Sequence, residues 1–177
     1  MSNIVDPFLV PRDIKTFAEE NVKKSFSIAC AKLKMNLPFH GVSFFQRSTT
    51  AGYVIPRRDN IVYLNLELLK RNKDFFEKDT IPHEVAHLFA DKVAMFAERP
   101  HGKTWKKIMK NVFGIEPKRC HHLDTEGVGK KVKKYKYICK CQKHEVSSVA
   151  HNKMQSQKAS YRCRKCYSSL TYLCDIK

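Results

Sequence analysis

Five consecutive residues, His83-Glu84-Val85-Ala86-His87, have the types and spacing of a catalytic metal site. On a helix, residues four apart project from one face, so both imidazoles can reach a single Zn²⁺ at about 2.0–2.1 Å. Glu84 follows the first ligand and is placed to take a proton from the attacking water, not to bind the metal. The motif predicts His83 and His87 as ligands of a catalytic zinc and Glu84 as the general base. The alternative is a pair of surface histidines around an exposed glutamate.

A catalytic zinc uses three protein ligands and keeps one position open for water. His101 is the predicted third ligand, because the fourteen residues after His87 allow the helix to end and the chain to turn back at Arg99-Pro100. Gly102 then allows a close backbone approach before the next helix. His121 and His122 remain alternatives for this third position.

A second metal site is predicted near the C-terminus, where Cys163 and Cys166 form a CxxC pair. Such a pair holds one side of a structural zinc, and two further ligands must come from a distant segment. Cys139, Cys141 and His144 are three candidates for these two places, and His151 is a fourth that fits less well. Cys141 with His144 has ordinary spacing, Cys139 with His144 needs a wider turn, and Cys139 with Cys141 is tight. The expected result is a zinc ribbon of two short hairpins, and the alternative is a redox pair or inert thiols.

The net charge of +17 points to a polyanionic partner, of which nucleic acid is the commonest. Residues 128–177 contain 13 basic and 2 acidic residues, so 13 − 2 = +11 of this charge lies there. Tyrosines alternate with the basic residues, and exposed rings could stack on unpaired bases, which favours single-stranded or distorted DNA. The alternatives are a generally basic surface and tyrosines that form the small core of the ribbon. The candidate nucleic-acid contacts are Lys133, Lys134, Lys136, Arg162, Arg164 and Lys165.

Hydrophobic spacing predicts both helices and short strands, which is an α+β composition. Pro82 either kinks the second helix or lies in the first turn of a further one. The composition changes near residue 128, which predicts a domain of residues 1–127 and a basic zinc-ribbon domain of residues 128–177. The expected helices span residues 13–37, 75–98 and 102–113, and the expected strands span residues 42–46, 51–55 and 61–66.

The seven cysteines favour a reducing compartment, where such clusters bind metal more often than they form disulfides. The N-terminal residues lack the basic and apolar regions of a signal peptide. No run approaches the roughly 20 apolar residues of a membrane span. We therefore expect a cytoplasmic protein without a membrane partner. We also expect a monomer, and association with the nucleoid is compatible with its charge.

Several segments, taken in order, resemble the SprT-like family, which includes bacterial SprT proteins and the eukaryotic DNA–protein-crosslink protease Spartan. The resemblance covers about residues 12–173 and is greatest to the bacterial members. It implies a small gluzincin-like protease fold, with helices around a short antiparallel sheet, followed by a zinc ribbon. It also implies the same zinc ligands and the same general base. The segments are Ala51-Gly52, Tyr63-Leu64-Asn65 with Leu68-Leu69, Pro82 to Leu88, Pro100 to Trp105, Cys139-x-Cys141-x-x-His144 with His151-Asn152, and Tyr161-x-Cys163-x-x-Cys166.

Two functional hypotheses follow. The first is a zinc metallopeptidase that acts on DNA-associated proteins, DNA–protein crosslinks among them, with one catalytic and one structural Zn²⁺. The second is a nucleic-acid-binding zinc protein with a structural or transcription-linked role and little protease activity. Tyr63 and Lys103 are the weakly supported candidates for a side chain that assists the zinc at the oxyanion.

Overall fold

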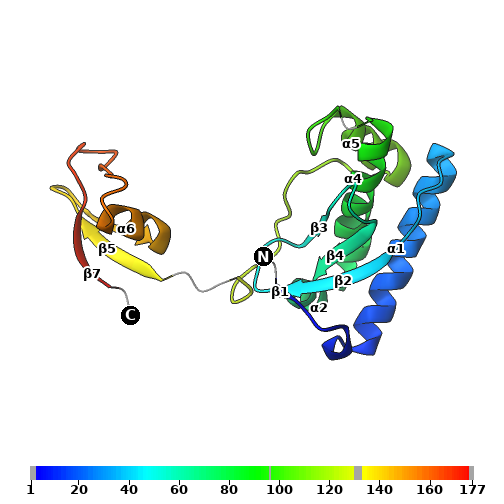
Figure 1. Ribbon diagram of the computed structural model, residues 1–177, viewed down its shortest axis with the longest axis horizontal. Helices are drawn as coiled ribbons and strands as arrows, with labels where there is room; N and C mark the ends of the chain where they lie inside the picture. Colours follow the sequence, from blue (N-terminus) through cyan, green and yellow to red (C-terminus); the bar gives the residue numbers. More distant parts are fainter. Residues whose placement is uncertain (1–2, 96, 130–132, 176–177) are drawn as a thin grey trace. The chain divides into compact units, whose positions relative to one another are not determined.

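The chain forms two compact units, Met1–Gly129 and Lys130–Lys177, in a computed structural model that describes residues 3–95, 97–129 and 133–175 (Figure 1). The first is called the N-terminal unit and the second the C-terminal unit. Phe96, Lys130, Lys131 and Val132, which belong to the predicted helix and basic run, lie outside the described residues. Among the described residues, no helix is long and apolar enough to cross a bilayer.

A mixed sheet of four strands organises the N-terminal unit, in the order β1-β2-β4-β3. Strands β2 and β4 run parallel, whereas β1 and β3 pair antiparallel at the two edges. The α+β class is confirmed, but the prediction of an antiparallel sheet was wrong for the central pair. The strands are β1 (Asn3–Ile4), β2 (Gly41–Gln46), β3 (Gly52–Val54) and β4 (Ile61–Asn65).

Burial explains this strand order. In β4, Val62 and Leu64 are fully buried, so the strand takes a central place where it has a partner on each side. The three-residue β3 forms a hairpin with β4 and occupies the edge. Because β3 reverses the chain between β2 and β4, those two strands must run in the same direction. The short edge strand is therefore left beside the helix that carries His83 and His87.

Helices α1 (Arg12–Leu33) and α4 (Ile81–Val93) pack against each other and cover the sheet, α1 at β2 and α4 at β3 and β4 (Figure 1). The buried face of α1 follows the three- and four-residue spacing seen in the sequence, through Ile14, Ala18, Val22 and Phe26. The helix ends at Lys34 in the left-handed conformation, before the predicted end at residue 37. This core fixes α4, and therefore the metal motif, against the sheet.

The segment predicted as one helix over residues 75–98 is divided. A π-helical turn, η2 (Phe76–Thr80), leads into α4 without a break, because Thr80 and Ile81 keep helical dihedral angles. Pro82 lies in the first turn of α4, which is the second of the two predicted alternatives. Helix α5 (Lys103–Ile108) continues into a π-helical turn, η3 (Met109–Phe113), and ends at Gly114 with a φ of 70°, at the predicted position. The elements that the sequence did not indicate are β1, η1 (Pro7–Leu9), α2 (Leu66–Arg71) and α3 (Lys73–Phe75).

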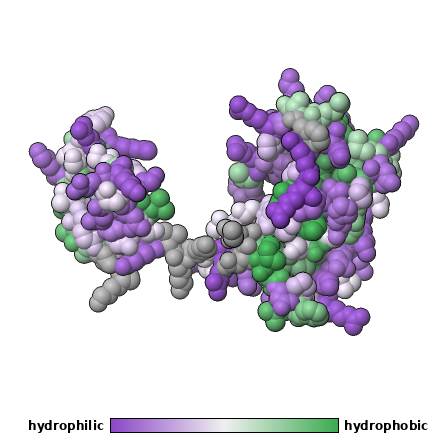
Figure 2. Space-filling model, viewed as in Figure 1, coloured by the Kyte–Doolittle hydropathy of each residue, from purple (hydrophilic) through white to green (hydrophobic). Residues whose placement is uncertain are grey.

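The C-terminal unit is a three-stranded antiparallel sheet in the order β6-β5-β7, with a helix between β6 and β7 in the chain. The expected hairpins are present, as β5–β6 and as a turn closed by the Arg162–Ser169 bridge, but the helix and the β5–β7 pairing were not anticipated. The visible face of this unit is mostly hydrophilic (Figure 2). The elements are β5 (Lys134–Ile138), β6 (Lys143–Ser147), α6 (Ser148–Gln155) and β7 (Thr171–Asp175).

Candidate metal centres

Three imidazoles converge at one point of the N-terminal unit. The Nε2 atom of His101 lies 3.0 Å from Nε2 of His83 and 3.1 Å from Nε2 of His87. Nitrogen ligands of one tetrahedral Zn²⁺ at about 2.0–2.1 Å would lie about 3.3 Å apart, so these three atoms have nearly the separation of a ligand set. The structure therefore brings together the three histidines that the spacing singled out.

Helix α4 orients the first two imidazoles because its other faces are anchored. Val85, Ala86 and Phe89 are fully buried in the core, which leaves the face of His83 and His87 turned toward the sheet edge. Burial is the main cause that lowers the pKa of His83 to about 4 and that of His87 to about 3. Both rings are therefore neutral at pH 7 and have a lone pair for a metal.

A strained turn brings His101 to the other two rings. The backbone of His101 has a φ of 63°, a left-handed conformation that costs a non-glycine residue about 1–3 kcal/mol. Nearby, the carboxylate of Glu98 accepts hydrogen bonds from the backbone N–H and the hydroxyl of Thr104, at 2.8 and 2.9 Å. A Cβ at position 102 would lie 2.9 Å from the backbone carbonyl oxygen of Arg99, which cannot move aside as a side chain can, so the turn favours glycine there. Glu98, Gly102 and Thr104 thus hold the turn that presents His101.

We predict that Glu98→Ala weakens zinc binding by about ten-fold, because a support behind a metal ligand commonly contributes a factor of 10–100. The hydrogen bonds from Thr104 hold the pKa of Glu98 below its ordinary value, so the carboxylate is ionised and accepts both bonds at neutral pH. The measurement is a competition titration of zinc against a chromophoric chelator. The matched control is Glu116→Ala, at an exposed position outside the turn. Equal affinities in the two variants would contradict the supporting role of Glu98.

Trp105 forms the floor beneath the three imidazoles. Its ring centroid lies 4.6–5.4 Å from the centroids of all three histidine rings, and its Nε1–H donates to the carbonyl of His83 at 3.3 Å. The side chain is only 2% exposed. It is the single tryptophan of the chain, so its fluorescence reports directly on this site.

Glu84 lies beside the imidazoles in a cavity of about 440 Å³ that is also lined by β3. Its side chain is buried, and desolvation raises the pKa of its carboxyl to about 8. A Cβ at position 52 would lie 3.0 Å from Cγ of Glu84, so Gly52 allows β3 to pack against this carboxyl. The cavity thus joins a proton-carrying group, three neutral imidazoles and a strand edge.

Asn65 fixes the segment that precedes Gly52. Its amide donates to the carbonyls of Ser48 and Thr50 at 2.7 and 2.9 Å, while its carbonyl oxygen caps the first turn of α2. The side chain is fully buried. Gly52, Asn65, Glu98 and Trp105 therefore support the site. Gly52, Asn65 and Trp105 belong to the segments that carry the family resemblance, but the sequence gave none of the four a role. An asparagine just before a helical run was the available signal for Asn65.

The other residues that the sequence offered for this site do not join the three converging histidines. His121 lines the same cavity, but its ring nitrogens contact the carbonyl of Thr49 and the N–H of Leu123, and it is not part of the described histidine group. His122 is also outside this group. Tyr63 stacks on Tyr53 and contacts Asp59, and neither Tyr63 nor Lys103 lines the cavity.

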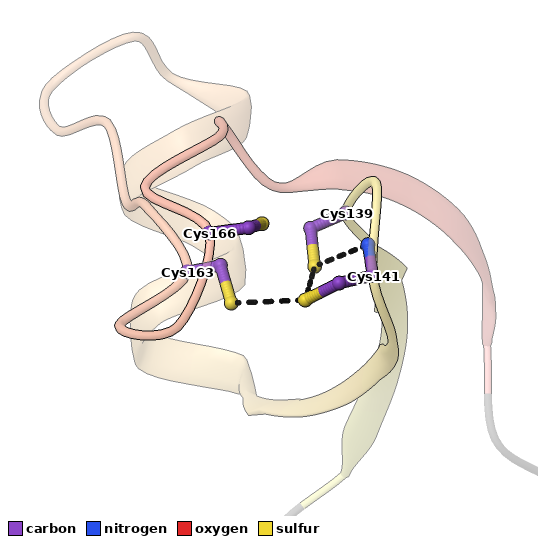
Figure 3. A group of neighbouring side chains, drawn as sticks. All are labelled: Cys139, Cys141, Cys163 and Cys166. Atoms are coloured by element: carbon purple, nitrogen blue, oxygen red, sulfur yellow. Dashed lines mark hydrogen bonds between the residues drawn. The ribbon is translucent and has the colours of Figure 1, made fainter.

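The C-terminal unit brings four sulfur atoms together. Cys139 and Cys141 come from the β5–β6 turn, and Cys163 and Cys166 from the facing loop, with all four Sγ atoms within 4.8 Å of one another (Figure 3). The hydrogen bond with Cys139 is the main cause that raises the pKa of the Cys141 thiol to about 12. Four thiols so close cannot all ionise unless a cation is present, and four thiolates are the donor set of a structural zinc.

His144 lies beside the sulfur cluster. Its Nε2 lies 3.2 Å from Sγ of Cys139, although it is not a member of the four-residue group. The structure therefore favours Cys139 with Cys141 for the two open ligand places, and His144 as a hydrogen-bond partner of a ligand. His151 lies elsewhere, with its ring stacked on Tyr135 at 3.6 Å and its Nδ1 3.0 Å from the hydroxyl of Tyr137.

The five tyrosines of the C-terminal unit lie in two places: three surround His151 (Tyr135, Tyr137 and Tyr172) and two lie beside the second cysteine pair (Tyr161 and Tyr167). Tyr137 is 2% exposed and packs with His151, so it belongs to the small core. Tyr161 and Tyr167 are 38% and 75% exposed and flank the second cysteine pair. All six basic candidates are exposed: Lys133, Lys134, Lys136, Arg162, Arg164 and Lys165. Of these, Lys134 is paired with Glu145 at 2.7 Å.

Known proteins identify the family. The SprT-like family model matches residues 21–121, which include the three converging histidines and Glu84. Protein SprT of Escherichia coli (strain K12) is 34% identical over 161 residues, which are 91% of this chain and 95% of that protein. Protein SprT of Vibrio parahaemolyticus is 33% identical over 155 residues, which are 88% of this chain and 92% of that protein. No solved structure matches the chain. The match over more than half of the chain and the identity along most of its length confirm the resemblance seen in the motifs, and the chain belongs to the SprT-like family.

Proposed function

We propose that the N-terminal unit is a zinc-dependent peptidase and that the C-terminal unit directs it to proteins on DNA, including proteins crosslinked to it. The observation that carries the proposal is the convergence of three Nε2 atoms, at 3.0 and 3.1 Å, beside the buried carboxyl of Glu84. Membership of the SprT-like family supports a metallopeptidase-like activity.

The residues of the cavity divide the chemistry of peptide hydrolysis among them. His83, His87 and His101 would hold the zinc, which when bound polarises the scissile carbonyl and acidifies water. Glu84 accepts the proton of the attacking water and delivers it to the amine that leaves. Its place beside the three imidazoles in the same cavity suits this exchange, because a general base must lie within reach of the water that it activates.

Strand β3 gives an extended substrate a place to bind. Residues Ala51 to Val54 line the cavity, and β3 is the edge strand of the sheet. An extended peptide can add to such an edge through backbone hydrogen bonds, without a strict sequence requirement. Binding of this kind suits an enzyme that acts on many different DNA-bound proteins.

The second cysteine pair carries the groups that suit unpaired bases. Tyr161 and Tyr167 are exposed beside Arg162, Arg164 and Lys165, so rings can stack on bases while the cations contact phosphates. We therefore propose single-stranded DNA as the preferred partner and the thiolate cluster as the structural zinc that shapes the loop. Four zinc-bound thiolates require reduced cysteines, which favours the cytoplasm as the working compartment.

A cleavage assay tests this proposal. We expect the zinc-loaded protein to cut a DNA-binding protein such as a histone, and single-stranded DNA that holds both to raise the rate by roughly ten-fold or more. Replacing Arg162, Arg164 and Lys165 with alanine should remove most of this stimulation. It should also reduce the steepness with which DNA binding weakens in salt. The slope of log binding constant against log salt concentration should become shallower by about 2, since each of three phosphate contacts to a single strand contributes about 0.7.

The control removes the same charge from α1, by alanine at Lys15, Lys23 and Lys24, which are all exposed. This variant should keep both the stimulation and the salt slope. If the two triple variants lose the same amount of slope, the DNA contact is not at the cysteine loop. If zinc-loaded protein cuts nothing with or without DNA, the peptidase proposal is wrong.

A further inference from the structure

A second cavity, of about 290 Å³, lies next to the candidate catalytic centre. It shares Pro56, His87, Pro100 and His101 with the larger cavity, but its lining includes neither His83 nor Glu84. Both cavities therefore open at the same two imidazoles. A substrate whose carbonyl lies at the three histidines would have a neighbouring side chain within reach of this smaller cavity.

Two alanines create the space. Ala90 follows His87 by three residues and lies on the same face of α4, and Ala94 is the residue at which this helix ends. Both line the cavity, and Ala90 is buried. Any longer apolar residue at position 90 would project into the hollow. The cavity therefore depends on the small size of these two side chains.

The walls of the cavity are rigid. Trp105 is nearly fully buried, and its ring lies almost parallel to that of His87, at 5.4 Å and 21°. On the outer side, Arg57 binds the carboxylate of Asp91 through Nε and Nη2, at 3.2 and 3.0 Å. This ion pair links the β3–β4 turn to α4, so the opening is held between the strand edge and the helix.

The charged groups of the lining balance one another. Asp91 is paired with Arg57, and the ionised carboxylate of Glu98, which accepts hydrogen bonds from Thr104, is matched by Arg99 in the same lining. The lining therefore has no net charge that would select a cation. The remaining surface comes mainly from alanine, proline and tryptophan, which suits an apolar group.

We propose that this cavity binds one uncharged, apolar side chain of the substrate, of the size of leucine or phenylalanine, next to the bond that is cut. The inference rests on the proposed function, because it takes the three histidines as the centre at which the substrate carbonyl lies. It assigns the choice of cleavage position to Ala90, Ala94 and Trp105. An enzyme that accepts many proteins through backbone contacts would thereby still prefer particular bonds.

Binding of small peptide hydroxamates to the zinc-loaded Glu84→Gln protein tests the inference without any cleavage. The hydroxamate group binds zinc, and the adjoining residue is varied among glycine, leucine, phenylalanine, lysine and glutamate. We expect the leucine and phenylalanine compounds to bind about 10–100-fold more tightly than the glycine compound, from burial of their side chains. The lysine compound should gain nothing. Calorimetry measures the dissociation constants, and Trp105 fluorescence reports that the ligand is at the site.

Ala90→Leu should abolish the preference for leucine over glycine while the glycine compound still binds. Ala94→Leu is the second variant, should the first fail to fold. Val93→Leu is the matched control, because Val93 is 44% exposed on the same helix and lines neither cavity.

The outcomes separate this inference from the proposed function. Equal affinities along the series, tightest binding of the glutamate or lysine compound, or a preference that survives Ala90→Leu and Ala94→Leu would each overturn the apolar site. None of these results would affect the peptidase proposal. A zinc-loaded protein that binds no hydroxamate at all would instead show that the metal is closed to ligands, which overturns both.

Discussion

Replacing Glu84 with glutamine is expected to lower kcat/KM for proteolysis by about 10²–10⁴-fold, the usual contribution of a general acid–base group. Glutamine has the same shape but cannot carry a proton. The zinc content should stay the same, because Glu84 is not one of the three converging ligands. Initial rates on a DNA-binding substrate, together with metal analysis of the purified variant, provide the measurement.

The same substitution has a second expected effect, on the metal-free protein. Burial raises the pKa of Glu84 from 4.5 to about 8 in the folded state. A carboxyl with a raised folded-state pKa contributes stability that is complete below pH 4.5 and is lost as the pH rises toward 8, by about 1.4 kcal/mol per pH unit. Glu84→Gln removes this loss. Relative to the wild type, the metal-free variant should therefore gain on the order of 3 kcal/mol between pH 5 and pH 7.5.

Urea unfolding of both metal-free proteins at the two pH values measures this gain. The difference between the proteins is informative because the lowered pKa values of His83 and His87 affect both of them alike. Glu20→Gln, at an exposed position of α1, is the control and should show no such pH dependence. Cleavage that persists in the zinc-loaded Glu84→Gln variant would remove Glu84 from the mechanism. A variant that lost zinc as well as activity would show that Glu84 supports the ligands instead.

The sequence predicted that His83 and His87 point to the same side, because both residues lie on one helix, where spacing alone determines direction. For His101, the sequence showed only that the number of residues after His87 is sufficient for the chain to turn back. Its approach depends on a left-handed backbone and on the Glu98–Thr104 contact, and no periodic pattern encodes either. The conformation of such an irregular turn is determined by side-chain contacts, and these contacts can be seen only in the folded structure.

The strand order illustrates a different limit. The three apolar runs gave the strands β2, β3 and β4 nearly to the residue, but each run is equally compatible with a central or an edge place. Fully buried Val62 and Leu64 put β4 in the centre, and β3 was thereby displaced to the edge. This displacement matters for function, because it puts Gly52 against Glu84 and opens the strand edge to the cavity.

The cysteine ligands were left open because spacing alone does not determine the path of a turn. Cys139 and Cys141 both lie in the short turn between β5 and β6. The turn brings their Sγ atoms to 3.4 Å, so the two side chains face one centre although only one residue separates them. The helix α6 was missed because it has few apolar residues and no buried ones. In a unit with so small a core, hydrophobic spacing gives little signal.

Cys163→Ser is expected to unfold the C-terminal unit while the N-terminal unit keeps its structure. In residues 133–175, the buried side chains are Tyr137, Cys139 and Cys163, so the described part of this unit has almost no apolar core. Below about 40–60 residues, such units usually depend on a metal or disulfides, and a structural zinc supplies roughly 10–16 kcal/mol of apparent binding energy. Loss of one of the four thiolates should therefore remove most of the folding energy of the unit.

Amide NMR spectra of the full-length protein measure this effect, because signals of the C-terminal unit should collapse to unfolded positions in the variant. Trp105 fluorescence should stay native, since Trp105 belongs to the N-terminal unit. The variant should also lose binding of single-stranded DNA, because the loop that carries Arg162, Arg164 and Lys165 would lose its shape. Cys174→Ser is the control: this exposed cysteine lies in β7 outside the sulfur cluster, so its loss should leave folding and DNA binding intact. Dispersed signals in the Cys163→Ser variant would mean that the unit folds without a complete thiolate set, and DNA binding would then have to be explained without a structural zinc.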